Sequence, residues 1–141
     1  MYVVSEIRRR RYRGRTVPVI SGPETVYNLL FPKLKKEHRE HFIALYLSTR
    51  NRVIAQETIS VGSLNASIVH PREVFRPALL HAAAALILAH NHPSGDPEPS
   101  QEDADITRRM HEAGKLLGIE LLDHVVLAAD GYTSLRERKL I

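Results

Sequence analysis

The spacing of apolar residues along the chain predicts buried strands and amphipathic helices, and therefore an α/β fold. Residues 84–89 form an unbroken apolar run that ends in His90-Asn91-His92, as is typical of a strand buried on both faces. Apolar residues in continuous or alternating runs predict further strands at residues 2–12, 41–47, 52–60, 119–129 and 132–135. Apolar spacings of three and four predict helices over residues 21–31, 70–80 and 100–117.

Two histidines lie one residue apart at the end of this apolar run. Side chains two residues apart in an extended backbone point to the same side, so His90 and His92 can converge on one object. The loop that follows is rich in proline, and Ser100 is the expected N-cap of the next helix. Asp103 then lies in the first helical turn and faces the strand end. Two imidazoles and one carboxylate are typical zinc ligands that leave a fourth position for water.

Each of these residues also has a simpler interpretation. Ser100 and Asp103 match a capping box, in which the carboxylate serves only the unpaired amides and the dipole of the helix. His90 or His92 alone is more often a hydrogen-bonded histidine at a strand end. The three residues together, at this spacing, favour a metal site.

A glutamate interrupts the apolar face of the predicted strand at residues 52–60. Strict alternation would place Glu57 on one face with Val53, Ala55, Ile59 and Val61. A carboxylate among apolar neighbours is costly unless something neutralises or uses it. We therefore expect Glu57 to act as the general base beside a metal-bound water. The alternative is that the strand is buried differently and Glu57 is solvated.

The spacing of His90, His92, Ser100 and Asp103 resembles the JAMM metalloprotease signature of the JAB/MPN+ superfamily. The sequence of residues 90–100 is similar to that of the bacterial RadC branch, and the resemblance covers residues 21–141. It includes residues 62–65, 71–75 and 122–124. The resemblance implies one domain with a JAB/MPN-like curved mixed β-sheet flanked by helices. Residues 1–20 would precede that domain as a basic edge strand or arm.

The resemblance also implies a zinc-dependent hydrolase, a metalloprotease or isopeptidase that acts on a peptide or protein substrate. His90, His92 and Asp103 would hold the zinc ion (Zn²⁺), and Glu57 matches the glutamate that the family carries upstream of its metal motif. Glu57 would take a proton from water and return it to the leaving nitrogen. The Ser100 hydroxyl, at the start of a helix, could donate to the tetrahedral oxyanion.

Two other classes of function stay open. The basic N-terminus and the RadC resemblance allow a metal-dependent nuclease or a DNA-repair-associated protein, although phosphodiesterases more typically use two metals. A non-catalytic protein-interaction module is the other alternative, and the presence of every candidate site residue argues against it. The helix-hairpin-helix domain that usually precedes the JAB domain of RadC is replaced here by residues 1–20, so we expect no DNA binding by that route. The short loops offer no counterpart to the insertions that bind ubiquitin in deubiquitinating relatives.

Composition narrows the setting in which the protein works. The chain has 141 residues, enough for one domain, and it has no cysteine and hence no disulfide framework. No apolar run approaches the length of a membrane span and no signal peptide is evident, so we expect a cytoplasmic protein without a membrane partner.

The net charge of +4 comes from arginines crowded at the N-terminus. Arg8, Arg9, Arg10 and Arg11 could bind nucleic acid weakly, or could simply keep an edge strand soluble. The sequence specifies neither the substrate nor the oligomeric state.

Overall fold

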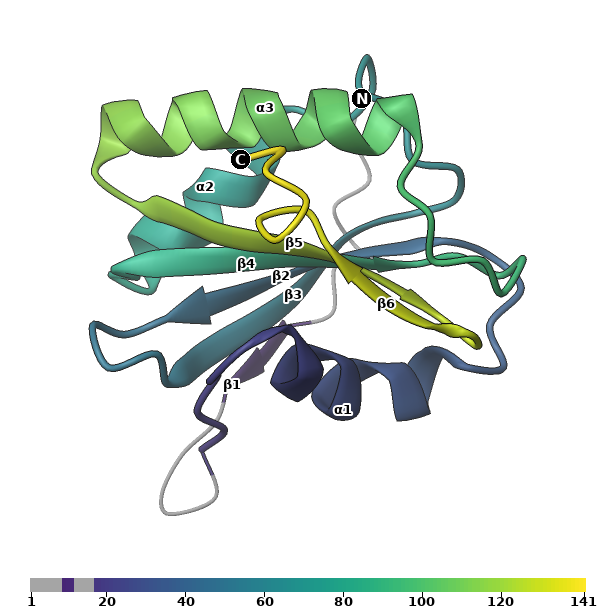
Figure 1. The fold of residues 1–141 in the computed structure, drawn as a ribbon. Helices are drawn as coiled ribbons and strands as arrows, with labels where there is room; N and C mark the ends of the chain where they lie inside the picture. Colours follow the sequence, from purple (N-terminus) through teal and green to yellow (C-terminus); the bar gives the residue numbers. More distant parts are fainter. Residues whose placement is uncertain (1–8, 12–16) are drawn as a thin grey trace.

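A mixed β-sheet forms the centre of the molecule in the computed structural model, which describes residues 9–11 and 17–141. Within these residues the sheet has six strands in the order β1-β3-β2-β4-β5-β6 (Figure 1). The elements in chain order are β1 (Arg9–Arg11), α1 (Pro23–Leu34), β2 (His41–Leu47), β3 (Val53–Val61), α2 (Pro71–Leu80), β4 (Ala85–Asn91), α3 (Gln101–Leu117), β5 (Glu120–Ala128) and β6 (Gly131–Ser134).

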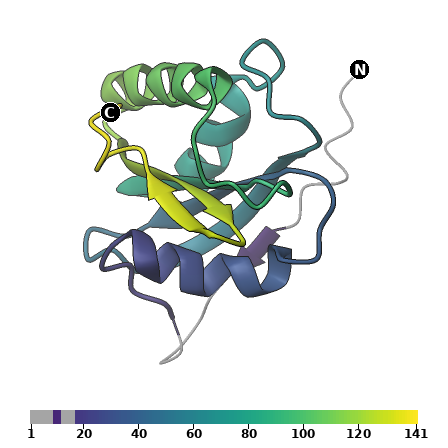
Figure 2. The same ribbon diagram turned by 45° about the vertical axis from the view of Figure 1, so that its right-hand side comes forward.

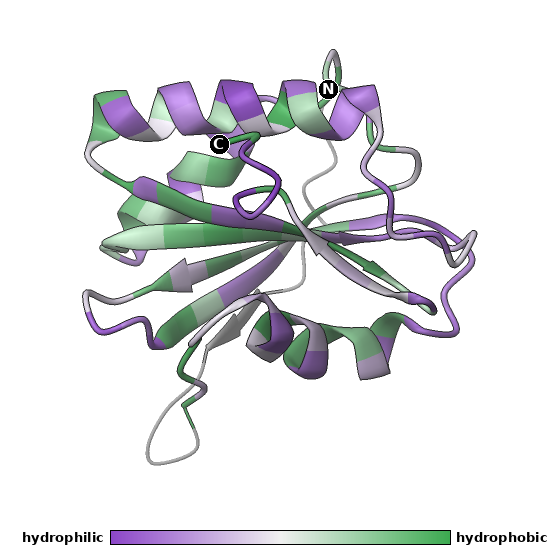
Figure 3. Ribbon diagram, in the orientation of Figure 1, coloured by the Kyte–Doolittle hydropathy of each residue, from purple (hydrophilic) through white to green (hydrophobic). Residues whose placement is uncertain are grey.

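Helices cover both faces of the sheet, which confirms the predicted α/β fold (Figures 1 and 2). Helix α1 packs on one face through Val26 and Leu30, whereas α2 and α3 pack on the other face. All seven residues of β4 are buried, as the unbroken apolar run predicted. Figure 3 shows that the central strands are largely hydrophobic, whereas α3 alternates hydrophobic and hydrophilic residues. Burial of these apolar surfaces is the main force that holds the layers together.

Strand β4 lies inside the sheet, between β2 and β5, and carries His90 near its C-terminal end. Strand β4 is antiparallel to β2, with Phe42 opposite His90, and it is parallel to β5, with Val126 opposite His90. A parallel connection needs a crossover, which here is α3. Helix α3 is the next element after β4, and its N-terminal turn lies near the end of β4 that carries His90, because Asp103 in that turn contacts His90.

Strand β3 departs from strict alternation. Its pairing with β2 shifts register at two points, where β3 has one residue more than β2, as in a β-bulge. As a result Val53 packs in the core under α1, while Ala55 packs in the core under α2 and α3. Ile59 and Val61 are only half-buried. The prediction that these residues share one face is therefore wrong for Val53, because each bulge turns the following residues to the opposite face.

The predicted edge strand is present where the structure describes it. Arg9–Arg11 pairs antiparallel with β3 at the edge of the sheet, and the remainder of the predicted strand, Arg8 included, lies outside the described residues. Among the residues that are described, no helix combines the length and apolar character needed to span a bilayer.

Candidate metal centre

His90, His92 and Asp103 converge at the point where the end of β4 meets the start of α3. The two histidine Nε2 atoms are 2.9 Å apart. Asp103 Oδ1 lies 3.0 Å from His90 Nε2, and Asp103 Oδ2 lies 3.2 Å from His92 Nε2. Ligand atoms about 2.0 Å from one tetrahedral zinc ion lie roughly 3.3 Å apart, so a small expansion of this cluster would accommodate the ion. His90 and Asp103 are buried, and His92 is 12% exposed.

The local backbone explains why the two histidines converge. His90 lies within β4, and the His92 amide continues the extended path by donating to the Leu127 carbonyl at 2.8 Å. Side chains two residues apart on this path share one face of the sheet. The β4 strand therefore presents both rings toward the helix that carries Asp103.

The capping box and the metal-ligand arrangement occur together at the start of α3. The Asp103 amide donates to Ser100 Oγ at 3.1 Å, and the Ser100 amide donates to Asp103 Oδ2 at 2.8 Å. Asp103 Oδ1 faces His90. The cap thus holds the carboxylate in one orientation while leaving it directed at both histidines, and the two interpretations of Asp103 do not exclude each other.

The electrostatics of the cluster favour a cation. Burial alone would raise the pKa of Asp103, but its hydrogen bonds to His90 and His92 outweigh burial and hold this pKa well below its usual range. The hydrogen bond to Asp103 likewise raises the pKa of His92 above its ordinary value, against the effect of burial. The group consequently attracts one positive charge, which a proton or a metal ion can supply.

The hydrogen bonds of His92 suit a metal ligand. His92 Nδ1 lies 2.9 Å from the carbonyl oxygen of Asp96, and because a carbonyl can only accept, Nδ1 is the donor. A neutral His92 then presents an unprotonated Nε2 to the cluster. Metal-binding histidines commonly donate their other ring N–H to a carbonyl in this way.

Glu40 is the fourth acidic or imidazole group at this site, and the sequence pattern did not predict it. One carboxylate oxygen of Glu40 and one ring nitrogen each of His90 and His92 all lie within 4.8 Å of one another. Glu40 directly precedes β2, and the Glu40 Oε2 atom accepts a hydrogen bond from the Leu64 amide at 2.8 Å. Phe42 is opposite His90 in the last pair of the antiparallel ladder, and Glu40 and His92 each lie two residues beyond that pair, at the same end of the sheet. The only sequence signal was an acidic residue immediately before an apolar strand.

The structure does not bring Glu57 to the histidines. Glu57 is fully buried, as the alternation predicted, but it is opposite Ala44 on β2, and Ala44 is opposite Leu88 on β4. Glu57 is therefore separated from β4 by the whole of β2, about 10 Å across the sheet. It is level with Leu88, which precedes His90 by two residues, about 7 Å along the strand. Of the two glutamates, Glu40 is the one that lies beside the histidines.

Ser100 lies at the exposed rim of the centre, beside Asp103. Its Oγ accepts the hydrogen bond of the capping box, and a hydroxyl that accepts in this way still carries a proton to donate. The predicted role of Ser100 toward an oxyanion is compatible with this position.

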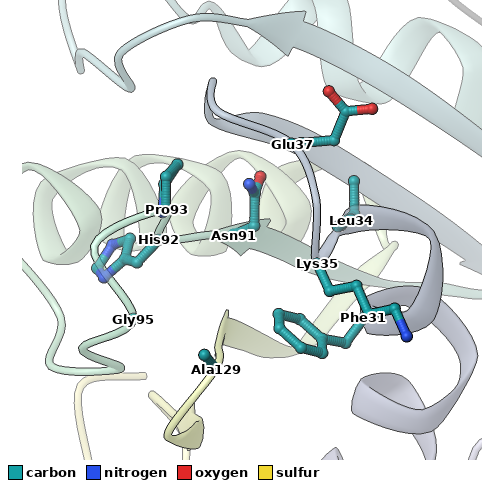
Figure 4. A pocket seen from close by; sticks show the side chains of 9 residues that line it. All are labelled: Phe31, Leu34, Lys35, Glu37, Asn91, His92, Pro93, Gly95 and Ala129. Carbon is teal, nitrogen blue, oxygen red and sulfur yellow. The ribbon is translucent and has the colours of Figure 1, made fainter.

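A small pocket of about 30 Å³ adjoins His92 (Figure 4). The C-terminal end of α1, the end of β4 and the β5–β6 turn contribute its lining: Phe31, Leu34, Lys35, Glu37, Asn91, His92, Pro93, Gly95 and Ala129. A cavity that holds one water molecule needs roughly 10–15 Å³, so the pocket admits only a small group.

Comparison with known proteins assigns the family. Residues 20–140 match the family model of the RadC-like JAB domain. The chain is 51% identical over 122 residues to a UPF0758 protein of Methanosarcina mazei and 54% identical over 121 residues to one of Shouchella clausii. Each alignment covers 86% of this chain and 53% of the relative, so the chain spans about half the length of these curated relatives. The chain belongs to the RadC-like JAB domain family, and the relatives' names state no activity.

Proposed function

We propose that the protein is a zinc-dependent hydrolase of amide bonds, a metalloprotease or isopeptidase of the JAMM type. The observation that carries this proposal is the convergence of His90, His92 and Asp103 at separations of 2.9 to 3.2 Å, with the Glu40 carboxylate beside the histidines. Membership of the RadC-like JAB domain family supports the same function.

His90, His92 and Asp103 would hold the metal. Two neutral imidazole nitrogens and one carboxylate leave a tetrahedral ion with one negative protein ligand and one open position, which is the arrangement of catalytic zinc sites. When bound, zinc supplies a Lewis acid and makes a water molecule acidic near neutral pH.

Glu40 is the residue that we assign to proton transfer, in place of Glu57. The Leu64 amide orients its carboxylate, which is half-buried and within 4.8 Å of the histidine nitrogens. Glu40 would take a proton from the attacking water and later deliver it to the leaving nitrogen. The Ser100 hydroxyl, on the exposed rim, would donate to the oxygen that becomes negative as the carbonyl is attacked.

The number of groups at the site bears on the kind of bond that is cut. A phosphodiesterase would more typically hold two metals, and the four groups that converge here suffice for one cation.

Metal analysis combined with a cleavage assay tests this proposal. The purified protein should contain one zinc per chain, His90→Ala and Asp103→Ala should lose it, and a control at the exposed His38, His38→Ala, should retain it. The zinc-loaded protein should cleave members of a quenched fluorescent peptide library, and a chelator should abolish the cleavage reversibly. Equal, negligible zinc in wild type and variants would show that the cluster is not a metal centre. Bound zinc without cleavage of any peptide or isopeptide probe would overturn the hydrolase function.

A further inference from the structure

A chain of three hydrogen bonds lies behind the metal centre and links its two buried ligands. Thr107 Oγ1 is 2.7 Å from the carbonyl oxygen of Asp103 and 2.6 Å from His124 Nδ1. His124 Nε2 is in turn 2.8 Å from His90 Nδ1. Thr107, His124 and His90 are each 0% exposed, so water does not compete for these contacts. These hydrogen bonds join α3, β5 and β4. They are separate from the capping box and do not follow from the spacing of the metal ligands.

The hydrogen bonds of this chain have one consistent direction. The Asp103 carbonyl can only accept, so the single proton of the Thr107 hydroxyl is donated to it. His124 Nδ1 must then donate to Thr107 Oγ1. A charged imidazolium would be costly at this buried position, and a neutral His124 has an unprotonated Nε2. That Nε2 accepts from His90 Nδ1, which leaves His90 Nε2 without a proton.

The opposite tautomer of His90 would obstruct the metal centre. Its Nε2–H would point at Asp103 Oδ1, only 3.0 Å away, and form a hydrogen bond that a metal ion would have to break. In that tautomer His90 Nδ1 and His124 Nε2 would both be bare acceptors 2.8 Å apart. The repulsion between two buried lone pairs disfavours this arrangement.

We propose that His124 and Thr107 are positioning residues that hold His90 in the tautomer able to bind a metal and that tie its position to that of Asp103. This inference rests on the proposed metal function. The His124 ring packs against Phe42, with the two ring centroids 5.8 Å apart, and the His124 backbone amide donates to Asp123 Oδ1 at 2.7 Å. Thr107 lies one helical turn after Asp103, so its hydroxyl contacts both the Asp103 carbonyl and the His124 ring.

Zinc affinity of paired variants tests the two positioning residues. Thr107→Val removes the hydroxyl and His124→Phe removes the ring nitrogens, so each variant breaks the hydrogen-bond chain. Each should weaken zinc binding by roughly 10- to 100-fold, measured by competition with a chromogenic chelator. Thr107→Ser keeps the hydroxyl and should bind zinc as the wild type does. In His124→Gln the side-chain carbonyl can accept from His90 and the amide can donate to Thr107, so most of the affinity should return. His38→Ala is the control for loss of a histidine elsewhere.

A second measurement does not depend on how the variants fold. In the metal-free wild type, long-range ¹⁵N–¹H NMR spectra should show the His90 proton on Nδ1 and the His124 proton also on Nδ1. A neutral His90 with its proton on Nε2 and none on Nδ1 would overturn the inference, and so would wild-type zinc affinity in folded Thr107→Val and His124→Phe. If the wild type binds no zinc, the metal function fails, and the same spectra still decide whether the chain sets the tautomer.

Discussion

A carboxylate oxygen of Glu40 and a ring nitrogen of His92 lie within 4.8 Å of each other, two residues beyond Phe42 and His90, the last pair of the β2–β4 ladder. The antiparallel pairing brings the start of β2 to the end of β4, so a carboxylate that precedes one strand reaches the imidazoles at the end of the other. A separate helix, α3, then closes the site with Asp103. The proposed base and the proposed ligands therefore come from segments far apart in the sequence.

Exchange of single carboxylates for amides should distinguish the two glutamates. Glu40→Gln should retain zinc and fold but lose about 10²–10⁴-fold in kcat, because the amide cannot accept the proton. Glu57→Gln should leave kcat within a few-fold of wild type, since Glu57 lies two strands from His90. Kinetics on zinc-loaded protein check both variants. Full activity in Glu40→Gln with loss in Glu57→Gln would return the base role to Glu57.

The two roles of Ser100 can be separated by a pair of substitutions. Ser100→Ala should cost about 1 kcal/mol of stability by removing the cap, whereas Ser100→Gly should cost only a few tenths. If the hydroxyl also donates to the oxyanion, both variants should lose kcat to a similar extent despite their different stabilities. Denaturant unfolding and kcat measured side by side provide the comparison. A loss of kcat confined to Ser100→Ala would assign the residue to capping alone.

The stability of the metal-free protein should depend on pH through His92. Its pKa is raised in the folded state, so its contribution is fully present below its unfolded value of about 6.5 and is lost as pH rises through the raised folded value. The lowered pKa of the buried His124 acts in the opposite sense over the same range, so the His92 contribution is obtained by comparing the wild type with Asp103→Asn. In urea unfolding with a chelator present, the stability that the wild type gains between pH 8 and pH 6 should exceed that of Asp103→Asn, because the hydrogen bond to Asp103 is the main cause of the His92 shift. An unchanged slope in Asp103→Asn would contradict this origin.

The depressed pKa of Asp103 acts at lower pH and in the opposite sense. Its stabilising contribution is present above the unfolded value of about 3.9 and is lost as pH falls through the depressed folded value. The metal-free protein should thus lose stability below about pH 4, and Asp103→Asn should lose less over the same range.

We expect the charges of the arginine-rich N-terminus to keep the edge of the sheet from pairing with other protein chains. Arg9–Arg11 forms β1, and edge strands need charge to avoid pairing with other chains. Replacing Arg8, Arg9, Arg10 and Arg11 with serine should lower the soluble yield and leave zinc content unchanged in the protein recovered. The salt dependence of DNA and RNA binding provides the contrary test. A slope that falls by about one for each lost phosphate contact would identify the arm as a nucleic-acid site.

The sequence alone was sufficient for the features that depend on neighbouring residues. The apolar run before His90 predicted the buried β4 strand, and the alternation of two residues predicted that His90 and His92 point the same way. The Ser100 cap predicted where α3 begins and hence where Asp103 lies. These features follow from backbone geometry over a few residues, which sequence spacing records directly.

Only the tertiary structure decided which glutamate reaches the histidines. Alternation identified Glu57 as buried, but burial is shared by every strand of a covered sheet, and the order β3-β2-β4 places a whole strand between Glu57 and His90. Glu40 and His124 reach the site through strand pairing, and a bulge in β3 moved Val53 to the opposite core. Strand order, register and bulges are set by the packing of segments distant in sequence, so no local period of apolar residues encodes them.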